Sequence, residues 1–204
     1  MQSNLRRNMK SLCFSGCSIT WGSELENPEE DRYSRIVSNH YGVIDNNISL
    51  RGVSNDDIVR RTIKHIDKNP VDIIIMQFTY VSRYQWISGK GKLYDWTPSI
   101  RNAEMFKDTP RKEYYKHIYT NHNGIENAWK NIFLFDRYCK SKNQKYVSLI
   151  NNHHAHFYEQ DCNWKKLCKC QVPTVLSIQK DHPSVEEHKT IADQVVRRID
   201  ELTV

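Results

Sequence analysis

Apolar and polar residues alternate along this chain in blocks that predict strands and helices in turn. The sequence predicts a buried first strand at residues 11–15 and further strands at 46–50, 71–77 and 145–150, with a short fifth at 174–178. Asn27-Pro28-Glu29-Glu30 predicts the start of a helix over residues 27–40, and apolar residues at helical spacing predict helices at 54–68, 124–141 and 185–202. This alternation favours a parallel sheet that is covered by helices on both faces.

Two stretches do not fit the alternation. Residues 80–122 are rich in Tyr, Trp and Arg, show no clean period and are too long for an ordinary loop, so we expect an inserted subdomain or lid. Its aromatic residues could stack sugars or bind a partner, and a small local core explains them equally well. Residues 151–173, which carry several His and Cys residues, are expected to form a loop.

Candidate chemistry lies at the two ends of the chain. Ser18 follows the first predicted strand in the turn Phe14-Ser15-Gly16-Cys17-Ser18-Ile19-Thr20-Trp21-Gly22, and a turn between strand and helix can present a Ser hydroxyl as a nucleophile. His182 lies just before Pro183, which suits a first helical turn, and Asp181 precedes it. A nucleophile and its base need to meet only in the fold. Taken singly, however, Gly-x-Ser turns are common, and His182 could be a solvated loop residue.

In these residues the chain resembles the SGNH hydrolases, also called the GDSL family. Gly16-Cys17-Ser18 matches their first block, Gly-Asp-Ser, with Cys in place of Asp, and Gly52 matches the Gly of their second block. Their third block, Gly-x-Asn-Asp, is degenerate here, since Gln77 replaces the Gly and Thr79 falls where the Asn should be. Their last block, Asp-x-x-His-Pro, keeps His182-Pro183 but has Gln179 at the position of the acid.

The resemblance implies a single α/β domain over residues 1–204, a flavodoxin-like three-layer αβα sandwich whose mainly parallel sheet has four to five strands. The segment at about 80–122 would be inserted as the lid. In such sheets, sites gather at the carboxyl ends of the strands. The implied activity is hydrolysis of an ester, for instance an O-acyl group on a carbohydrate, without a cofactor.

The resemblance also assigns roles to residues. Ser18 would attack the ester carbonyl, His182 would act as its base, and Asp181 would be the displaced orienting acid. The oxyanion would be held by the N–H groups of Ser18 and Gly52 and by Thr79. We expect Trp86, Trp96 and Arg83 to contact the substrate. The alternative is a catalytically degenerate member of the fold that serves as a binding or structural module.

The composition of the chain limits the kinds of ligand and partner that we expect. The net charge of +6 allows an anionic substrate, but no motif favours nucleic acid, so we expect none. No apolar run is long enough for a membrane span or a signal peptide, so we expect a cytoplasmic protein. Six cysteines in such a protein are expected to be free thiols. Their Cys-x5-Cys-x-Cys spacing is not a common zinc pattern, so no metal is expected.

Overall fold

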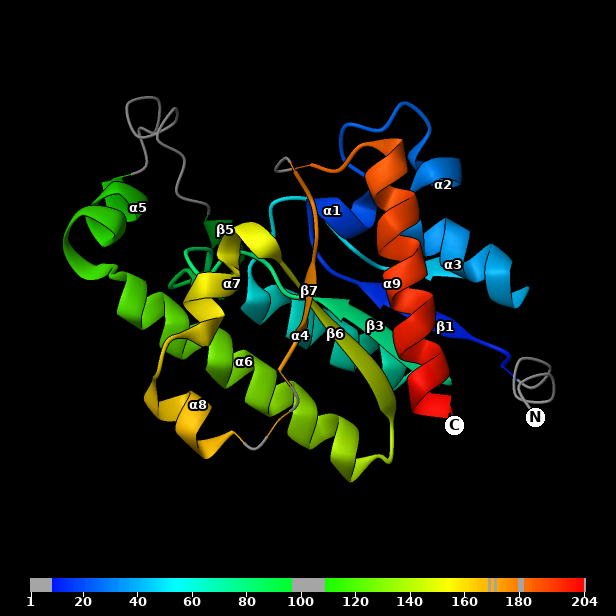
Figure 1. Cartoon of the computed structure of the whole chain (residues 1–204). Coiled ribbons are helices and arrows are strands. Elements are labelled where there is room, and N and C mark those ends of the chain that lie inside the picture. Colours follow the sequence, from blue (N-terminus) through cyan, green and yellow to red (C-terminus); the bar gives the residue numbers. More distant parts are fainter. Residues whose placement is uncertain (1–8, 97–108, 169, 171, 180–181, 204) are drawn as a thin grey trace.

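Five parallel strands form the central sheet of the protein. The computed structural model describes residues 9–96, 109–168, 170, 172–179 and 182–203. Within the sheet the strands lie in the order β2 (Asp45–Asn47), β1 (Leu12–Ser15), β3 (Ile73–Gln77), β6 (Lys145–Asn151) and β7 (Thr174–Leu176) (Figure 1). Every pairing between neighbours is parallel. The predicted α/β fold with a parallel sheet is therefore confirmed.

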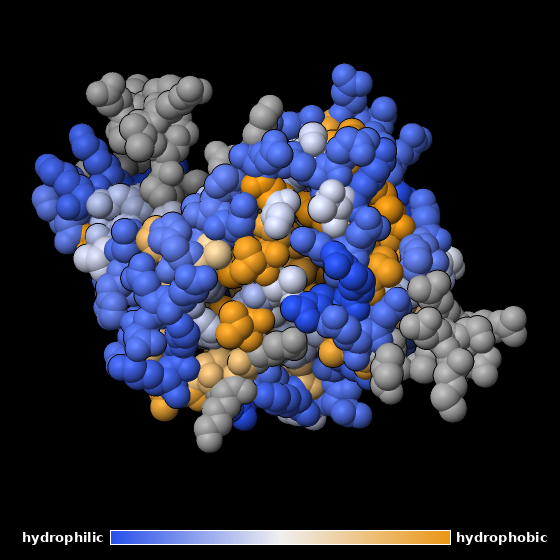
Figure 2. All heavy atoms as spheres, viewed as in Figure 1, coloured by the Kyte–Doolittle hydropathy of each residue, from blue (hydrophilic) through white to orange (hydrophobic). Residues whose placement is uncertain are grey.

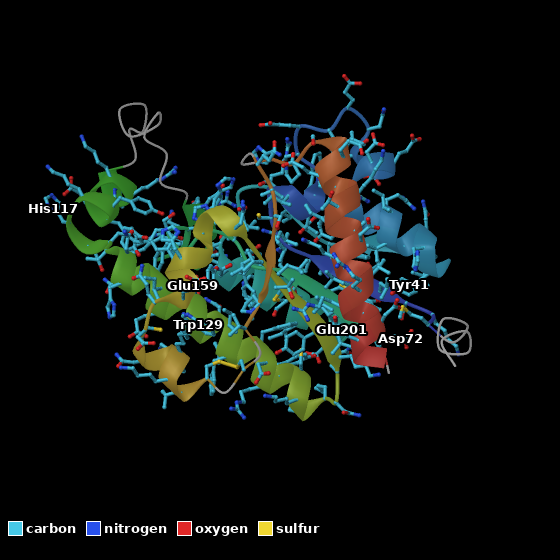
Figure 3. All side chains as sticks on the ribbon, viewed as in Figure 1. Tyr41, Asp72, His117, Trp129, Glu159 and Glu201 are labelled. Carbon is cyan, nitrogen blue, oxygen red and sulfur yellow. A yellow bond between two sulfur atoms is a disulfide. The ribbon has the colours of Figure 1, made fainter. Side chains whose placement is uncertain are left out.

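Helices cover both faces of this sheet. One face packs against α3 (Tyr33–Tyr41) and α9 (Val185–Thr203), and the other packs against α4 (Asn55–Ile66) and α6 (Asn121–Ser141) (Figure 1). Side chains that alternate along a strand point to opposite faces. In β3, Ile73 and Ile75 accordingly join the core under α3 and α9, whereas Ile74 and Met76 join the core under α6. Trp129 of α6, labelled in Figure 3, is among the largest side chains in this second core.

The polar surface lies outside these two cores. Figure 2 shows hydrophilic residues over most of the visible face, with apolar residues gathered toward its centre. No helix in the part of the chain that the structure describes has both the length and the apolar composition that crossing a bilayer requires.

The helix expected over residues 27–40 is in fact two helices. The chain leaves α2 (Pro28–Asp31) at Arg32, whose backbone is extended with a ψ of 144°, before α3 begins at Tyr33. The Arg32 guanidinium is buried and lies 2.8 Å from carboxylate oxygens of both Glu29 and Asp45. Asp45 belongs to β2, so a contact between distant parts of the chain accompanies the break that local periodicity did not predict.

The prediction of a loop over residues 151–173 is wrong as well. The segment contains α7 (Asn152–Glu159) and α8 (Asn163–Leu167). Side chains cap both helices: Asn151 Oδ1 accepts the N–H of His153 at 2.8 Å, and Cys162 Sγ accepts the N–H of Lys165 at 3.3 Å. Such caps satisfy N–H groups that have no partner within a helix.

The cysteines differ from expectation in one pair. Cys168 and Cys170 form a disulfide, whereas the other four cysteines are free and buried. The free thiols were predicted, but the pairing of Cys168 with Cys170 was not. The spacing of cysteines in a sequence does not show which of them the backbone brings close together. Among the described residues, no group of three or more His, Cys, Asp or Glu side chains is placed to hold a metal ion.

The inserted segment begins as a hairpin. Strands β4 (Tyr84–Ile87) and β5 (Leu93–Trp96) are antiparallel, and they are followed by α5 (Thr109–Glu113) and a π-helical turn, η1 (Tyr114–Ile118). The hairpin is tied to the start of α4, because Ser54 donates to Asp95 Oδ1 from its N–H at 3.1 Å and from its hydroxyl at 2.6 Å. The loop that carries Gly52 and the inserted segment are therefore neighbours.

The core also holds a histidine whose protonation is opposed by burial. His188 of α9 is fully buried, its Nδ1 accepts the N–H of Tyr33 at 3.2 Å, and its Nε2 has no partner among the described residues. Burial lowers the pKa of His188 to about 4. Protons bind the unfolded chain more readily than the folded one in this range, so stability decreases as the pH falls below the ordinary histidine pKa.

We predict that His188 contributes a loss of about 2 kcal/mol in the free energy of unfolding between pH 7 and pH 5. Urea unfolding at both pH values should show a smaller loss for His188→Gln than for the unsubstituted protein. The exposed His117 provides a control, and His117→Gln should keep the full dependence. Equal dependence in both variants would contradict the burial of an uncharged His188.

Candidate active site

Ser18 is the first residue of a single helical turn at the carboxyl end of β1. This turn, α1 (Ser18–Trp21), ends at Gly22, whose φ of +86° suits glycine. Ser18 is 6% exposed, and its Oγ lies 3.9 Å from the Sγ of Cys17. The N–H groups at the start of a helix have no intrahelical partner and favour negative charge. The expected passage from strand to turn to helix is therefore present, but the Ser18 side chain is almost fully buried and not exposed as the motif suggested.

The turn packs too closely on β3 for any side chain at Gly16. A Cβ built there would lie 2.3 Å from Thr20 Oγ1 and 3.0 Å from both Cβ and Oε1 of Gln77. The Gln77 Oε1 accepts hydrogen bonds from the Thr20 hydroxyl at 3.0 Å and the Cys17 N–H at 3.4 Å. Gln77, at the position that matches the family's third-block Gly, therefore holds the turn that carries Ser18 against the end of β3.

The loop of the second block lies beside this turn. Leu50 donates its N–H to the carbonyl of Gly16 at 3.3 Å, and Arg51 places its guanidinium 4.5 Å from the ring centre of Trp21. Gly52 follows with a φ of +74°, and a Cβ there would meet open space. The structure thus places Ser18 and Gly52 on adjoining loops at one edge of the sheet.

A small cavity opens at the ends of β1, β3 and β6. It has a volume of about 10 Å³, room for about one water molecule, and its polar lining includes Cys17, Thr79 and Asn151. Thr79 Oγ1 and Asn151 Nδ2 are both buried; Asn151 Nδ2 has no hydrogen-bond partner among the described residues, whereas the Thr79 hydroxyl interacts with the Cys17 thiol and helps to lower its pKa. The sequence had singled out Thr79 but not Asn151, although its position directly after a predicted strand was a usable signal.

Arg83 is a buried cation that acts on Cys17, one of the residues lining this cavity. It is 8% exposed, its Nη1 donates to the carbonyl of Val53 at 3.3 Å, and its Nε has no partner within the described residues. Burial raises the pKa of the Cys17 thiol, but the positive charge of Arg83 and nearby hydrogen-bonding groups outweigh burial and lower it below its ordinary value. The buried Arg83 therefore acts on the electrostatics of the turn, and the substrate contact expected of it stays a prediction.

His182 lies beside the loop that follows α1. Its Nδ1 is 2.8 Å from Oε1 of Glu24, which lies six residues after Ser18. The segment with His182-Pro183 therefore contacts the loop that follows the Gly16-Cys17-Ser18 turn. No hydrogen bond joins Ser18 and His182, both of which the structure describes. Glu24 was missed because nothing local in the sequence marks it.

The structure describes only part of the remaining residues that the sequence singled out. Asp181 lies outside the described residues. Gln179 is exposed, and its N–H donates to a carboxylate oxygen of Glu187. Trp86 in β4 is 40% exposed, while the side chain of Trp96 in β5 also lies outside the described part of the structure.

The close approach at Gly16 predicts that Gly16→Ala lowers the free energy of unfolding by about 1–3 kcal/mol, the usual range for overpacking. The cause is the contact of the new methyl group with Thr20 and Gln77. Gly89→Ala is the matched control, because a Cβ at Gly89 meets nothing within 4 Å. Chemical denaturation of both variants should show the loss only at Gly16, and equal stability would contradict the tight packing of the turn.

Comparison with known proteins bears on the fold. No family profile and no curated protein matches the sequence. Solved structures do match over nearly the whole chain. The psychrotrophic esterase EstA from Pseudoalteromonas sp. is 10% identical, with a TM-score of 0.56 over 94% of this chain and 97% of its own. A protein from Desulfitobacterium hafniense assigned to the lipolytic G-D-S-L family is 12% identical, with a TM-score of 0.54 over 93% and 99%. The acetylxylan esterase Axe2 from Geobacillus stearothermophilus is 13% identical, with a TM-score of 0.51 over 94% of each chain. The chain therefore has the fold of the SGNH (GDSL) hydrolases.

Proposed function

We propose that the protein is a serine esterase or deacylase in which Ser18 is the nucleophile and His182 the general base. The observation that carries this proposal is the contact between His182 and the loop directly after α1. His182, from the far end of the chain, thus contacts the loop that follows the turn carrying Ser18, at the strand ends where sites gather in such sheets. The neighbours of the same fold include proteins named as esterases, which agrees with this chemistry.

The proposed reaction follows from these positions. Ser18 Oγ attacks the ester carbonyl while His182 Nε2 takes the hydroxyl proton, and the same proton then goes to the leaving alcohol. Water, activated by His182, attacks the resulting acyl-serine and releases the acid. Both steps pass through a tetrahedral intermediate whose oxygen carries negative charge, and the N–H groups of Ser18 and Gly52 are proposed to donate to it.

A third donor is proposed for the same oxygen. Thr79 offers one rotatable hydroxyl where the family has an Asn side chain. Its Oγ1 is buried, and the hydroxyl is one of the hydrogen-bonding groups that lower the pKa of the Cys17 thiol, so it would turn from Cys17 to the oxyanion during the reaction. Loss of one such donor typically costs about 3–4 kcal/mol of transition-state stabilisation. This hydroxyl is therefore worth more to an esterase than to a binding module of the same fold.

The substrate is proposed to be an O-acyl group on a carbohydrate. One neighbour of the same fold is named as an acetylxylan esterase. The insertion at about 80–122 presents partly exposed aromatic side chains, including Trp86 and Tyr94, which suit stacking on sugar rings. In this role it would form the lid of a single domain.

We predict that Ser18→Ala abolishes hydrolysis of p-nitrophenyl acetate and labelling by a fluorophosphonate. His182→Ala should lose nearly as much activity, and the double variant should be little worse than either, because residues that act as one unit are not additive. The measurements are kcat/KM and intact mass after labelling. Ser141→Ala and His117→Ala change exposed residues and serve as controls that should keep full activity.

Two results would contradict the proposal. Undiminished activity in Ser18→Ala would show that Ser18 is not the nucleophile. If the fold-losses of kcat/KM in the two single variants multiply in the double variant, Ser18 and His182 act separately. If the unsubstituted protein neither hydrolyses esters nor becomes labelled, the chain is the degenerate binding or structural module instead.

A separate prediction tests the lid. Trp86→Ala should raise KM for acetylated xylan and leave kcat for p-nitrophenyl acetate unchanged, because it removes a contact that only the large substrate makes. Trp86 is 40% exposed, so its truncation should change the melting temperature little. Leu134→Ala, a truncation of similar exposure on α6, is the control for nonspecific effects. An unchanged KM for xylan would contradict the lid.

A further inference from the structure

The contact between His182 and Glu24 joins residues 158 positions apart, and it supplies what the last sequence block lacks. We infer that Glu24 is the carboxylate that orients His182, an assignment that rests on the proposed function. The Oε1 of Glu24 lies 2.8 Å from Nδ1 of His182, within the range of a strong hydrogen bond. Glu24 touches His182 and not the ester, so it is a positioning residue.

The chemistry of the pair fixes the histidine tautomer. An ionised carboxylate only accepts hydrogen bonds, so the proton of the neutral imidazole must lie on Nδ1. The lone pair is then on Nε2, the atom that takes the proton from Ser18. A carboxylate at Nδ1 also stabilises the imidazolium that forms during each step.

The backbone holds Glu24 in place despite local strain. Glu24 has a φ of +70°, a region that is uncommon for residues other than glycine, and Asn143 is the other non-glycine example among the described residues. The N–H of Ser23 donates to the carbonyl of Ser18 at 2.9 Å, and the N–H of Leu25 donates to that of Gly22 at 3.3 Å. Glu24 is thus fixed relative to the nucleophile turn, and a strained residue retained beside a site indicates a need for its side chain.

Other carboxylates are less suitable. Gln179 carries an amide at the position where the family has its acid. Glu187 instead bonds the Ser184 hydroxyl at 2.9 Å and N–H at 2.8 Å, at the start of α9. Asp181 lies outside the described residues, so the experiment compares it directly with Glu24.

A purely structural role explains the pair poorly. The Glu24 side chain is 73% exposed and that of His182 is 27% exposed. Ion pairs with this exposure add little to stability, because water and salt screen them. The contact is therefore expected to show in turnover and not in the melting temperature.

The test is the kinetics of p-nitrophenyl acetate hydrolysis by Glu24→Gln. An amide can donate to Nδ1 and so favour the wrong tautomer, and loss of the orienting acid in a Ser–His enzyme lowers kcat by roughly 10²–10⁴-fold. We expect a fall in kcat of at least about 20-fold, slower labelling by a fluorophosphonate, and a KM and melting temperature close to those of the unsubstituted protein. Glu24→Asp, which keeps the carboxylate, should recover part of the lost kcat.

Three further variants complete the design. Glu24→Gly relieves the backbone strain and removes the carboxylate, so it should be as stable as the unsubstituted protein and as slow as Glu24→Gln. Glu26→Gln, an exposed change two residues further along the same loop, is the matched control and should keep full kcat. Asp181→Asn should have a smaller effect than Glu24→Gln.

The outcomes separate this inference from the proposed function. Full kcat in Glu24→Gln together with an inactive Ser18→Ala would overturn the role of Glu24 alone, and a large loss in Asp181→Asn would then assign the acid to Asp181. Full activity in Glu24→Gly would also overturn it. Retained activity in Ser18→Ala would overturn the proposed function and the role of Glu24 with it.

Discussion

The candidate site depends on the close approach of α1 to the end of β3, which is possible only because residue 16 has no side chain. A Cβ at Gly16 would overlap the Thr20 hydroxyl and press on Gln77. With glycine there, Gln77 accepts hydrogen bonds from both Thr20 and Cys17 and ties the turn to the neighbouring strand. Packing between the turn and β3 therefore determines where Ser18 lies relative to the end of the sheet.

This packing gives a physical meaning to the divergence of the third block. A glutamine at position 77 is larger than the family's glycine, and it uses its extra atoms to hold the nucleophile turn. The divergent residue thus has a packing role of its own at the end of β3. The polar side chains that line the small cavity also come from separate parts of the chain. Thr79 lies just after β3, and Asn151 is the last residue of β6. A sequence motif can describe only hydrogen-bond donors that lie close together in the chain. The fold can bring such donors together from any strand that ends at the same edge of the sheet.

Much of the fold could be predicted because local patterns determine it. The buried strands and the amphipathic helices α4, α6 and α9 were recognisable from apolar spacing, and their alternation determined the parallel sheet. The break at Arg32, the short helices α7 and α8 and the bond between Cys168 and Cys170 were not predicted. The break coincides with an ion pair to a distant strand, the short helices depend on side-chain caps, and the disulfide depends on the path of the backbone. None of these leaves a periodic signal.

The same distinction applies within the site. Ser18, Gly52 and His182 could be proposed from short motifs, because each lies in a turn whose residues have strong local preferences. Glu24 could not, since its position depends on a left-handed backbone and on a loop from the other end of the chain. The electrostatics show the same limit. The thiol of Cys17 occupies the position of the family's Asp, and the positive charge of Arg83, from a distant part of the chain, helps to lower its pKa. The buried guanidinium also donates to the carbonyl of Val53 and lies 4.7 Å from the ring centre of Tyr80, so its place beside the turn depends on contacts between segments that no short motif marks.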